Sequence, residues 1–213
     1  HCAESSHHGS RSTTALMMAA HRGQERAVGL LIRHGADVNR QDSDGVAALT
    51  AAAESGHERV LDLLLRHGAE VNLQESEGGT ALMLAASQGH GRVVDLLLRH
   101  GAEINLQNSD GVTALLAAAD KGHERVVDLL IRRGAEVNLQ RSDGLTALMC
   151  AALFNHPAVV RRLLRAGADT AARTEDGKTA LQLAKEEGHA ECVEAFRTYL
   201  GEVAGRSKAP SAE

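Results

Sequence analysis

Apolar residues recur with helical spacing in two short segments of the chain, residues 81–87 and 91–100. The apolar side of the first segment consists of Leu82, Ala85 and Ala86, and that of the second consists of Val93, Val94, Leu96, Leu97 and Leu98. Thr80 stands where a helix N-cap is expected, and Gln88–Gly89–His90 separates the two segments. The pattern therefore predicts a short helix, a tight turn and a second short helix.

The same pattern returns along the chain with a period of 33 residues. Two rows of glycines mark this period: Gly45, Gly78, Gly111, Gly144 and Gly177, and Gly35, Gly68, Gly101, Gly134 and Gly167. Gly101 is expected to end the second helix in the left-handed conformation, residues 104–107 to be extended, and Asp110–Gly111 to turn the chain back. Helices of this length are marginal alone in water, so each pair must bury its apolar side against the next pair. We therefore predict an all-α solenoid built as a one-dimensional stack.

Composition narrows the classes of partner. The 213 residues carry a net charge of −5 and contain two Phe, one Tyr and no Trp, so they lack the positive charge and the stacking side chains that nucleic-acid binders use. The longest apolar runs are too short to span a membrane. Cys2, Cys150 and Cys192 are widely spaced, which indicates reduced thiols in a cytoplasmic or nuclear protein. We expect neither nucleic-acid binding nor membrane insertion.

No local motif indicates catalytic or metal-binding chemistry. Histidines recur once per unit in the turn between helices, at His57, His90, His123, His156 and His189. Equivalent histidines stand one whole unit apart and cannot share a metal ion, so we interpret them as turn residues that bond to the backbone. Cys150 and Cys192 fall at core positions, and no phosphate loop, nucleophile elbow or zinc motif is present. We predict no enzymatic activity, no metal, no cofactor and no disulfide.

The repeated segment TALxxAAxxGHxxVVxLLLxxGAxVNxQ resembles the ankyrin repeat, and it recurs six times between about residues 11 and 200. The resemblance implies stacked helix–turn–helix ankyrin repeats with short β-hairpin loops, and a concave groove that holds partner proteins. The expected units lie near residues 11–41, 42–74, 75–107, 108–140, 141–173 and 174–200. We refer to them as units one to six.

The ends of the chain should differ from the middle. Units one and six are expected to act as caps, because a polar outer face keeps a stack soluble. In unit six, Phe196, Tyr199 and Leu200 are expected to plug the inner side. Residues 1–10 are expected to be a disordered segment, either native or left over from cloning, and residues 201–213 a flexible tail.

Positions that differ between units are free for roles other than stacking. They gather just after the hairpin glycine and at the end of each first helix, and the resemblance implies that both sets line the groove. The alternative is drift on a solvated surface, which explains most of these differences. The candidate partner-binding residues from these sets are Val112 and Leu145 after the glycine, and Glu54, Gln88, Asp120, Lys121, Leu153 and Phe154 at the helix ends.

Two features go beyond drift. The hairpin tips carry an acidic row, formed by Asp44, Glu77, Asp110, Asp143 and Asp176, which should make one rim of the groove negative and attract a basic partner segment. Unit five is apolar where its siblings are polar: Leu145, Leu153 and Phe154 should lie together, with Met149 one turn below Leu153. The alternative for Phe154 is that it folds over the unusual turn formed by residues 155–157.

Four asparagines have a further role if the resemblance holds. Asn39, Asn72, Asn105 and Asn138 each follow an acidic residue and a Val or Ile, which is similar to the site that the family's asparaginyl hydroxylase accepts. The alternative is that each side chain only bonds the turn backbone. Unit five has Ala171 at this position and should not be modified.

These observations together predict a non-catalytic, monomeric module that binds a peptide or protein in its groove, as part of a larger adaptor or scaffold protein. Two rival hypotheses stay open. One is a substrate-recognition domain of an enzyme whose catalytic region lies outside this chain. The other is a purely structural spacer.

Overall fold

The computed structural model describes residues 14–206, in which twelve helices form six pairs. The first helices of the pairs are α1 (Ala15–His21), α3 (Ala48–Glu54), α5 (Ala81–Ser87), α7 (Ala114–Asp120), α9 (Ala147–Leu153) and α11 (Ala180–Glu186). The second helices are α2 (Glu25–Arg33), α4 (Glu58–Arg66), α6 (Gly91–Arg99), α8 (Glu124–Arg132), α10 (Pro157–Arg165) and α12 (Ala190–Arg206). The two helices expected near residues 81–87 and 91–100 are therefore α5 and α6. The expected N-terminal segment 1–10 lies outside the described residues.

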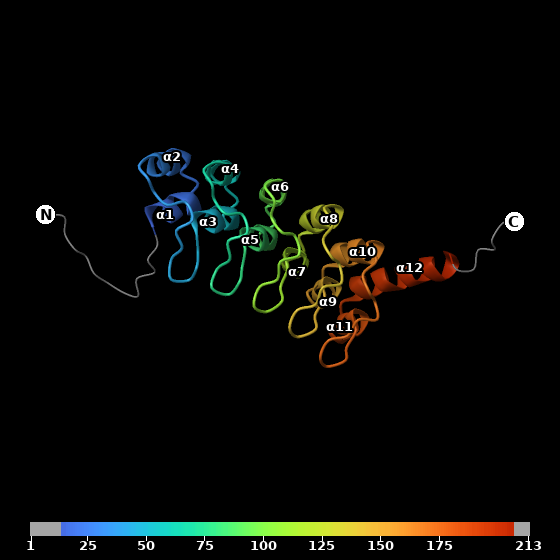
Figure 1. The fold of residues 1–213 in the computed structure, drawn as a ribbon. Coiled ribbons are helices and arrows are strands. Elements are labelled where there is room, and N and C mark those ends of the chain that lie inside the picture. Colours follow the sequence, from blue (N-terminus) through green and yellow to red (C-terminus); the bar gives the residue numbers. More distant parts are fainter. Residues whose placement is uncertain (1–13, 207–213) are drawn as a thin grey trace.

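The pairs stack side by side in chain order. Figure 1 shows the second helices along one side, the first helices along the middle, and the hairpin loops on the side opposite the second helices. Successive first helices contact one another from α1 to α11, and successive second helices do so from α2 to α12. This arrangement confirms the predicted all-α solenoid.

Threonine side chains begin most first helices. The hydroxyl of Thr80 accepts a hydrogen bond from the backbone N–H of Met83 at 3.3 Å, and Thr113 and Thr146 do the same for the residues three places on. Unit two reverses the arrangement, because Ala47 occupies the cap position and the hydroxyl of Thr50 accepts from the Ala47 N–H at 3.0 Å. The helix start therefore depends on one hydroxyl that either position can supply.

The core runs the length of the stack without interruption. Its leucines from the second helices are completely buried, as at Leu64, Leu97, Leu130 and Leu163. The paired alanines of the first helices are equally buried, namely Ala52, Ala53, Ala85, Ala86, Ala118, Ala119, Ala151 and Ala152. Small side chains at these positions allow neighbouring first helices to approach closely, so each short helix is stabilised by the units beside it.

The hairpin loops are tight turns that bond to their neighbours. In unit four the N–H of Asn108 donates to the carbonyl of Val112 at 3.1 Å, and the N–H of Ser109 donates across units to the carbonyl of Glu77 at 2.9 Å. Within residues 14–206 the only β-pairing outside the helices is an isolated bridge between Gln140 and Thr146. Residues 104–105, which were expected to be extended, form a turn. Each hairpin loop is therefore held partly by hydrogen bonds to the loop of the neighbouring unit, and the described loops form no regular β-strands.

The turn histidines join neighbouring units. The Nε2–H of His123 donates to the carbonyl of Ser87 at 2.8 Å, and that of His57 donates to the carbonyl of His21 at 3.0 Å. Each of these rings lies beneath the glycine of the preceding turn. The predicted bond to the backbone is confirmed, although the carbonyl belongs to the preceding unit. His90 and His156 make the same bond through Nε2, whereas His189 donates from Nδ1 to the carbonyl of Ala152 at 3.0 Å.

The repeated asparagines also link units. The side-chain oxygens of Asn39, Asn72, Asn105 and Asn138 each accept an N–H from the next unit at 2.9 Å, from Glu70, Glu103, Glu136 and Asp169 respectively. Each asparagine side chain therefore bonds to loop backbone, as the alternative to hydroxylation expected, and the backbone belongs to the next unit. Ala171 breaks the row, and the equivalent donor position, residue 202, lies in α12 and not in a loop.

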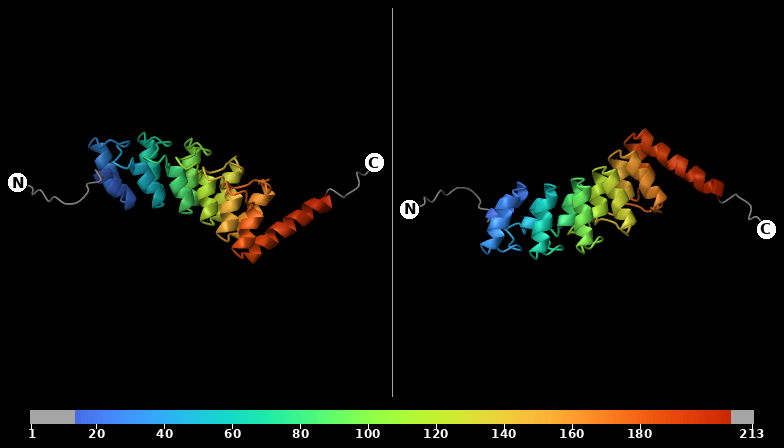
Figure 2. Two further views of the ribbon diagram at one scale, coloured as in Figure 1. Left: turned by 90° about the horizontal axis from the view of Figure 1, so that it is seen from below. Right: turned by 90° about the horizontal axis from the view of Figure 1, so that it is seen from above.

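The C-terminal end departs from the expected tail. Helix α12 has 17 residues, whereas the second helices before it have nine, and Figure 2 shows it projecting away from the stack. Residues 201–206 are therefore helical, and residues 207–213 lie outside the described part. Phe196 is buried and Tyr199 is half-buried against the core, as expected, but Leu200 is 45% exposed. The expectation that Leu200 plugs the inner side was wrong, because it lies near the start of the projecting part of α12.

Unit one exposes two large apolar side chains. Met18 and Leu30 are 46% and 49% exposed, whereas Ala51, at the position of Met18 in unit two, is 6% exposed. The reason is that no helix pair precedes α1 within the described residues.

Candidate partner-binding surface

The variable positions lie on the side of the stack where the first helices end and the hairpins turn. Two cavities open on this side. One, of about 290 Å³, is lined by residues of α1, α3 and the hairpin between them, including Met18, Val46 and Glu54. The other, of about 200 Å³, lies among α5, α7 and α9 and is lined by Val112, Asp120 and Arg141 among others. A further cavity, between α10 and α12, contains none of the predicted residues.

Unit five presents two apolar side chains at the end of its first helix. Leu153 is the last residue of α9 and is half-buried, and Phe154 caps the helix and is 50% exposed. Neither belongs to the core or packs against it, whereas Leu145 does pack against the core. Met149 is 1% exposed, so its expected place on the surface was wrong. Its position one turn before Leu153 directs it into the interface between first helices.

The turn after Phe154 explains its exposure. Asn155 adopts a positive φ of 57°, at a position where the five other units have a glycine with positive φ. The backbone thus makes the same turn in unit five as in its siblings. Phe154 stays half-exposed, so it is not buried over the turn as the alternative requires.

The equivalent residues of unit four are charged and paired. Lys121 Nζ lies 3.0 Å from Asp120 Oδ2. The side chain of Gln88 in unit three is exposed, as is that of Glu54 in unit two, while Val112 is half-buried against the core beside the second cavity. The surface therefore changes from polar to apolar between units four and five.

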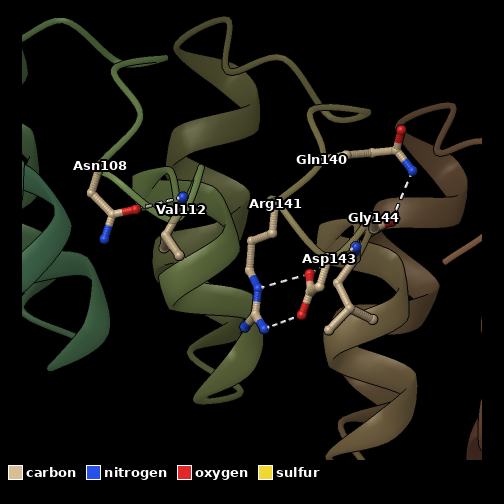
Figure 3. Close-up of polar contacts among 7 residues, drawn as sticks. Asn108, Val112, Gln140, Arg141, Asp143 and Gly144 are labelled. Atoms are coloured by element: carbon tan, nitrogen blue, oxygen red, sulfur yellow. Dashed lines mark hydrogen bonds and ion pairs between the residues drawn. The ribbon is translucent and has the colours of Figure 1, made fainter. Parts of the chain in front are cut away.

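An arginine changes the hairpin of unit five. In unit four, Asn108 Oδ1 accepts the N–H of Val112 at 2.8 Å and so holds the turn. Arg141 stands at the same position in unit five and cannot accept a hydrogen bond. Figure 3 shows its guanidinium bonded twice to Asp143, with Nε 3.1 Å from Oδ1. Asp143 Oδ1 takes over the role of Asn108 by accepting the N–H of Leu145 at 3.1 Å.

This contact neutralises part of the predicted acidic row. Burial acts to raise the pKa of the Asp143 carboxyl, but the hydrogen bonds from Arg141 and from the Leu145 N–H lower that pKa below its usual range. The hydrogen bond to Asp143 raises the pKa of Arg141 in turn. Asp143 is therefore an ionised but paired residue. The expectation of a uniformly negative rim has to be corrected at unit five.

Carboxylates of units two and three form the negative part of the surface. Among residues 14–206, Asp42, Glu54, Glu75 and Glu77 take part in none of the ion pairs found. Burial is the main cause that raises the pKa of Glu75 above its usual range, followed by repulsion from Glu54, while a hydrogen bond from Thr50 opposes the shift. Asp42 and Glu77 add to the repulsion, so all three neighbouring carboxylates act on the pKa of Glu75 and the four together form a negatively charged cluster.

Arg141 and Glu75 were not singled out from the sequence. They occupy one position of the hairpin, which is Asp42 in unit two, Asn108 in unit four and Thr174 in unit six. That position carries a different residue in each unit, so its variability was the available signal. Its turn-capping role, visible in the bonds of Asn108, concealed its possible use in recognition.

The described residues offer little to a metal or a nucleophilic reaction. No group of three His, Cys, Asp or Glu side chains within them could hold a metal ion. Burial raises the pKa of the Cys150 thiol to about 12, so it stays protonated at neutral pH. Cys150 and Cys192 are both free and buried. In the part of the chain that the structure describes, no helix has the length and apolar character of a membrane span.

Comparison with known proteins finds one family. The family profile described as "Ankyrin repeats (3 copies)" matches residues 2–75, 67–141 and 126–203, which together span nearly the whole chain. No curated protein matches the chain.

Proposed function

The chain belongs to the ankyrin-repeat family, and from this premise we propose that it is a binding module for a peptide or protein. Repeats of this kind are generally protein–protein interaction modules, and no catalytic family is detected in the chain. The observation that carries the proposal is the exposure of Phe154, beside Leu153, on the side formed by the first helices and hairpins.

Two physical arguments support a partner at this place. A large apolar side chain that is half-exposed and outside the core favours association with a partner. Aromatic residues on well-formed surfaces also recur among the side chains that contribute most to binding. The same side of the stack has a cavity of about 200 Å³ among α5, α7 and α9, which could hold a partner side chain.

The proposal places the module in the cytoplasm or the nucleus, as a monomeric and non-catalytic part of an adaptor or scaffold. The two buried free thiols are consistent with a reducing compartment. The rival in which the chain recognises substrates for an enzyme differs only in what lies outside these residues. This rival also requires that a protein or peptide bind to the surface of unit five.

Affinity capture tests the proposal. The chain is immobilised, proteins are captured from a cell lysate, and the captured set is compared with that of a Leu153→Asp/Phe154→Asp variant by mass spectrometry. A matched control replaces Leu30 and Leu200, two exposed apolar residues of second helices, with Asp. Proteins lost with the unit-five variant and kept with the control support the proposal. Identical capture by all three chains would contradict the assignment of binding to unit five, and the absence of any captured protein would support the spacer hypothesis.

A further inference from the structure

The charges of the candidate surface are divided between its two halves. In units four to six three acidic groups have basic partners: Asp120 with Lys121 at 3.0 Å, Asp143 with Arg141, and Glu186 with Lys178 at 2.6 Å. Asp110, Asp176 and Glu187 take part in none of the ion pairs found among the described residues. In units two and three, Asp42, Glu54, Glu75 and Glu77 have no such partner among the described residues. The electrostatic field of this side is therefore more negative at units two and three than at units four to six, where basic side chains offset part of the negative charge.

The apolar residues show the opposite distribution. Leu153 and Phe154 stand in unit five, at helix-end positions that are Glu54 and Ser55 in unit two and Ser87 and Gln88 in unit three. A partner that only buried apolar surface would find nothing comparable at units two and three. A partner that only carried positive charge would gain little at units four to six.

We propose that this surface binds an extended, basic peptide segment, with a bulky apolar residue seated on Leu153 and Phe154 and at least two Lys or Arg residues facing units two and three. The proposal rests on the proposed function and adds the class of partner to it. Of the two sets, the apolar contact provides the anchor, and the carboxylates select the sequence beside it.

The geometry of the stack sets the spacing in such a peptide. Glu54 and Phe154 end equivalent first helices three units apart. Neighbouring helices pack about 8–10 Å apart, so the two sites are separated by roughly 24–30 Å. An extended chain advances about 3.3 Å per residue, so about seven to nine residues connect the apolar anchor to the basic pair. This spacing distinguishes the proposal from a general attraction between opposite charges.

Charge also argues against a second copy of this chain as the occupant. Each chain carries a net charge of −5, and pairing two copies would bring the carboxylates of units two and three near further negative charge. An acidic partner is disfavoured for the same reason. A basic segment gains twice at the end formed by units one to three, because its charges face the carboxylates and its long aliphatic stems can also pack on apolar neighbours such as Val46 and Met18, which line the first cavity.

Selection from a random peptide library of about 16 residues tests the proposal, since that length covers the spacing with flanks to spare. The immobilised full chain is the bait, and the enriched peptides are then resynthesised with a fluorescent label for titration. We expect an apolar residue and a basic pair about seven to nine residues apart. Binding should weaken about tenfold or more in the Leu153→Asp/Phe154→Asp variant, which is about 1.4 kcal/mol.

Carboxylate variants test the basic part of the proposed peptide separately from its apolar anchor. Glu54→Gln/Glu75→Gln should weaken binding severalfold and reduce its dependence on salt, whereas Glu186→Gln/Glu187→Gln in unit six should not. Peptides that need Leu153 and Phe154 but contain no basic pair, or bind the Glu54→Gln/Glu75→Gln variant equally well, would overturn this inference and leave the proposed function standing. If no peptide is enriched, or if those enriched ignore unit five, both fail.

Discussion

The Nε2 of His156 lies 2.9 Å from the carbonyl oxygen of Asp120, one unit back along the chain. Because a carbonyl oxygen can only accept, the imidazole donates at Nε2 and the ring is held against the turn of the preceding unit. The same ring fills the space beneath Gly122, where an added Cβ would lie 2.5 Å from its Nδ1. The turn of one unit and the histidine of the next therefore form a single contact.

This contact predicts that Gly122→Ala destabilises the stack more than Gly188→Ala does. Both glycines have a φ of 73°, so each substitution introduces backbone strain of about 1 kcal/mol. Only Gly122 faces a histidine ring, whereas nothing lies within 4 Å of a Cβ at Gly188. Chemical denaturation should therefore show a clearly larger loss of unfolding free energy for Gly122→Ala. Equal losses would mean that the ring moves aside freely.

The asparagine row predicts a stability effect that depends on position. Asn105→Ala removes the acceptor for the Glu136 N–H and should lower the free energy of unfolding by about 1 kcal/mol. Ala171→Asn should give no matching gain, because residue 202 is helical and its N–H is not presented by a loop. Urea titration of both variants checks the pair. A stabilised Ala171→Asn variant would show that the helical conformation of residue 202 does not prevent the bond.

Hydroxylation of the asparagines is a separate prediction. Treating the chain with the family's asparaginyl hydroxylase should add one oxygen to one or more of Asn39, Asn72, Asn105 and Asn138, and none at Ala171. Mass spectrometry of proteolytic fragments reads the result. Since the carboxamides are engaged with the next unit, modification requires local opening of the loop. No modified asparagine after prolonged treatment would exclude the role.

Cys150 should be chemically silent in the folded protein. With its pKa near 12 and its side chain buried, the thiol should react with iodoacetamide only after denaturant is added. Mass spectrometry of protein labelled at pH 8 with and without denaturant checks this. Labelling of Cys150 in the native state at the rate of the unfolded chain would contradict its placement in the core.

Glu75 predicts a pH effect of defined sign. Its pKa is raised in the folded state, so between the usual glutamate value and the raised value the folded protein binds more protons than the unfolded one. The free energy of unfolding should therefore fall as the pH rises through that window. Glu75→Gln should remove this component and stabilise the protein above it. Thermal unfolding from pH 4 to pH 8 measures the difference between the two chains, and no difference would mean that burial and the neighbouring carboxylates do not raise the pKa of Glu75.

The repeat made most of the fold predictable. Equivalent glycines, threonine caps and apolar stripes impose the same local structure in every unit, so one well-interpreted unit, such as α5 and α6, predicts the rest. The bonds between units were harder to predict. The partners of Asn105 and His123 lie in neighbouring units, and the short-range signals of turns do not show that.

The candidate surface was predicted less completely, for three separate reasons. Met149 was misplaced because an apolar residue one turn from Leu153 can face either the core or the groove, and the period of the helix alone does not decide. Asp143 was taken to be part of a negative rim, because its pairing depends on the direction of the Arg141 side chain. The helical extension of α12 was missed because the small and charged residues from Gly201 onward were interpreted as a frayed tail, yet the helix continues to Arg206.

The central claim is that unit five binds a partner through Phe154, and one variant measured in two ways tests it most directly. Phe154→Ala should leave the melting temperature nearly unchanged, because the side chain is half-exposed and outside the core. The same variant should bind the selected peptides about tenfold more weakly, equivalent to about 1.4 kcal/mol. A clear fall in melting temperature, approaching the roughly 1.5–3 kcal/mol of a buried phenylalanine, together with unchanged binding, would contradict the account.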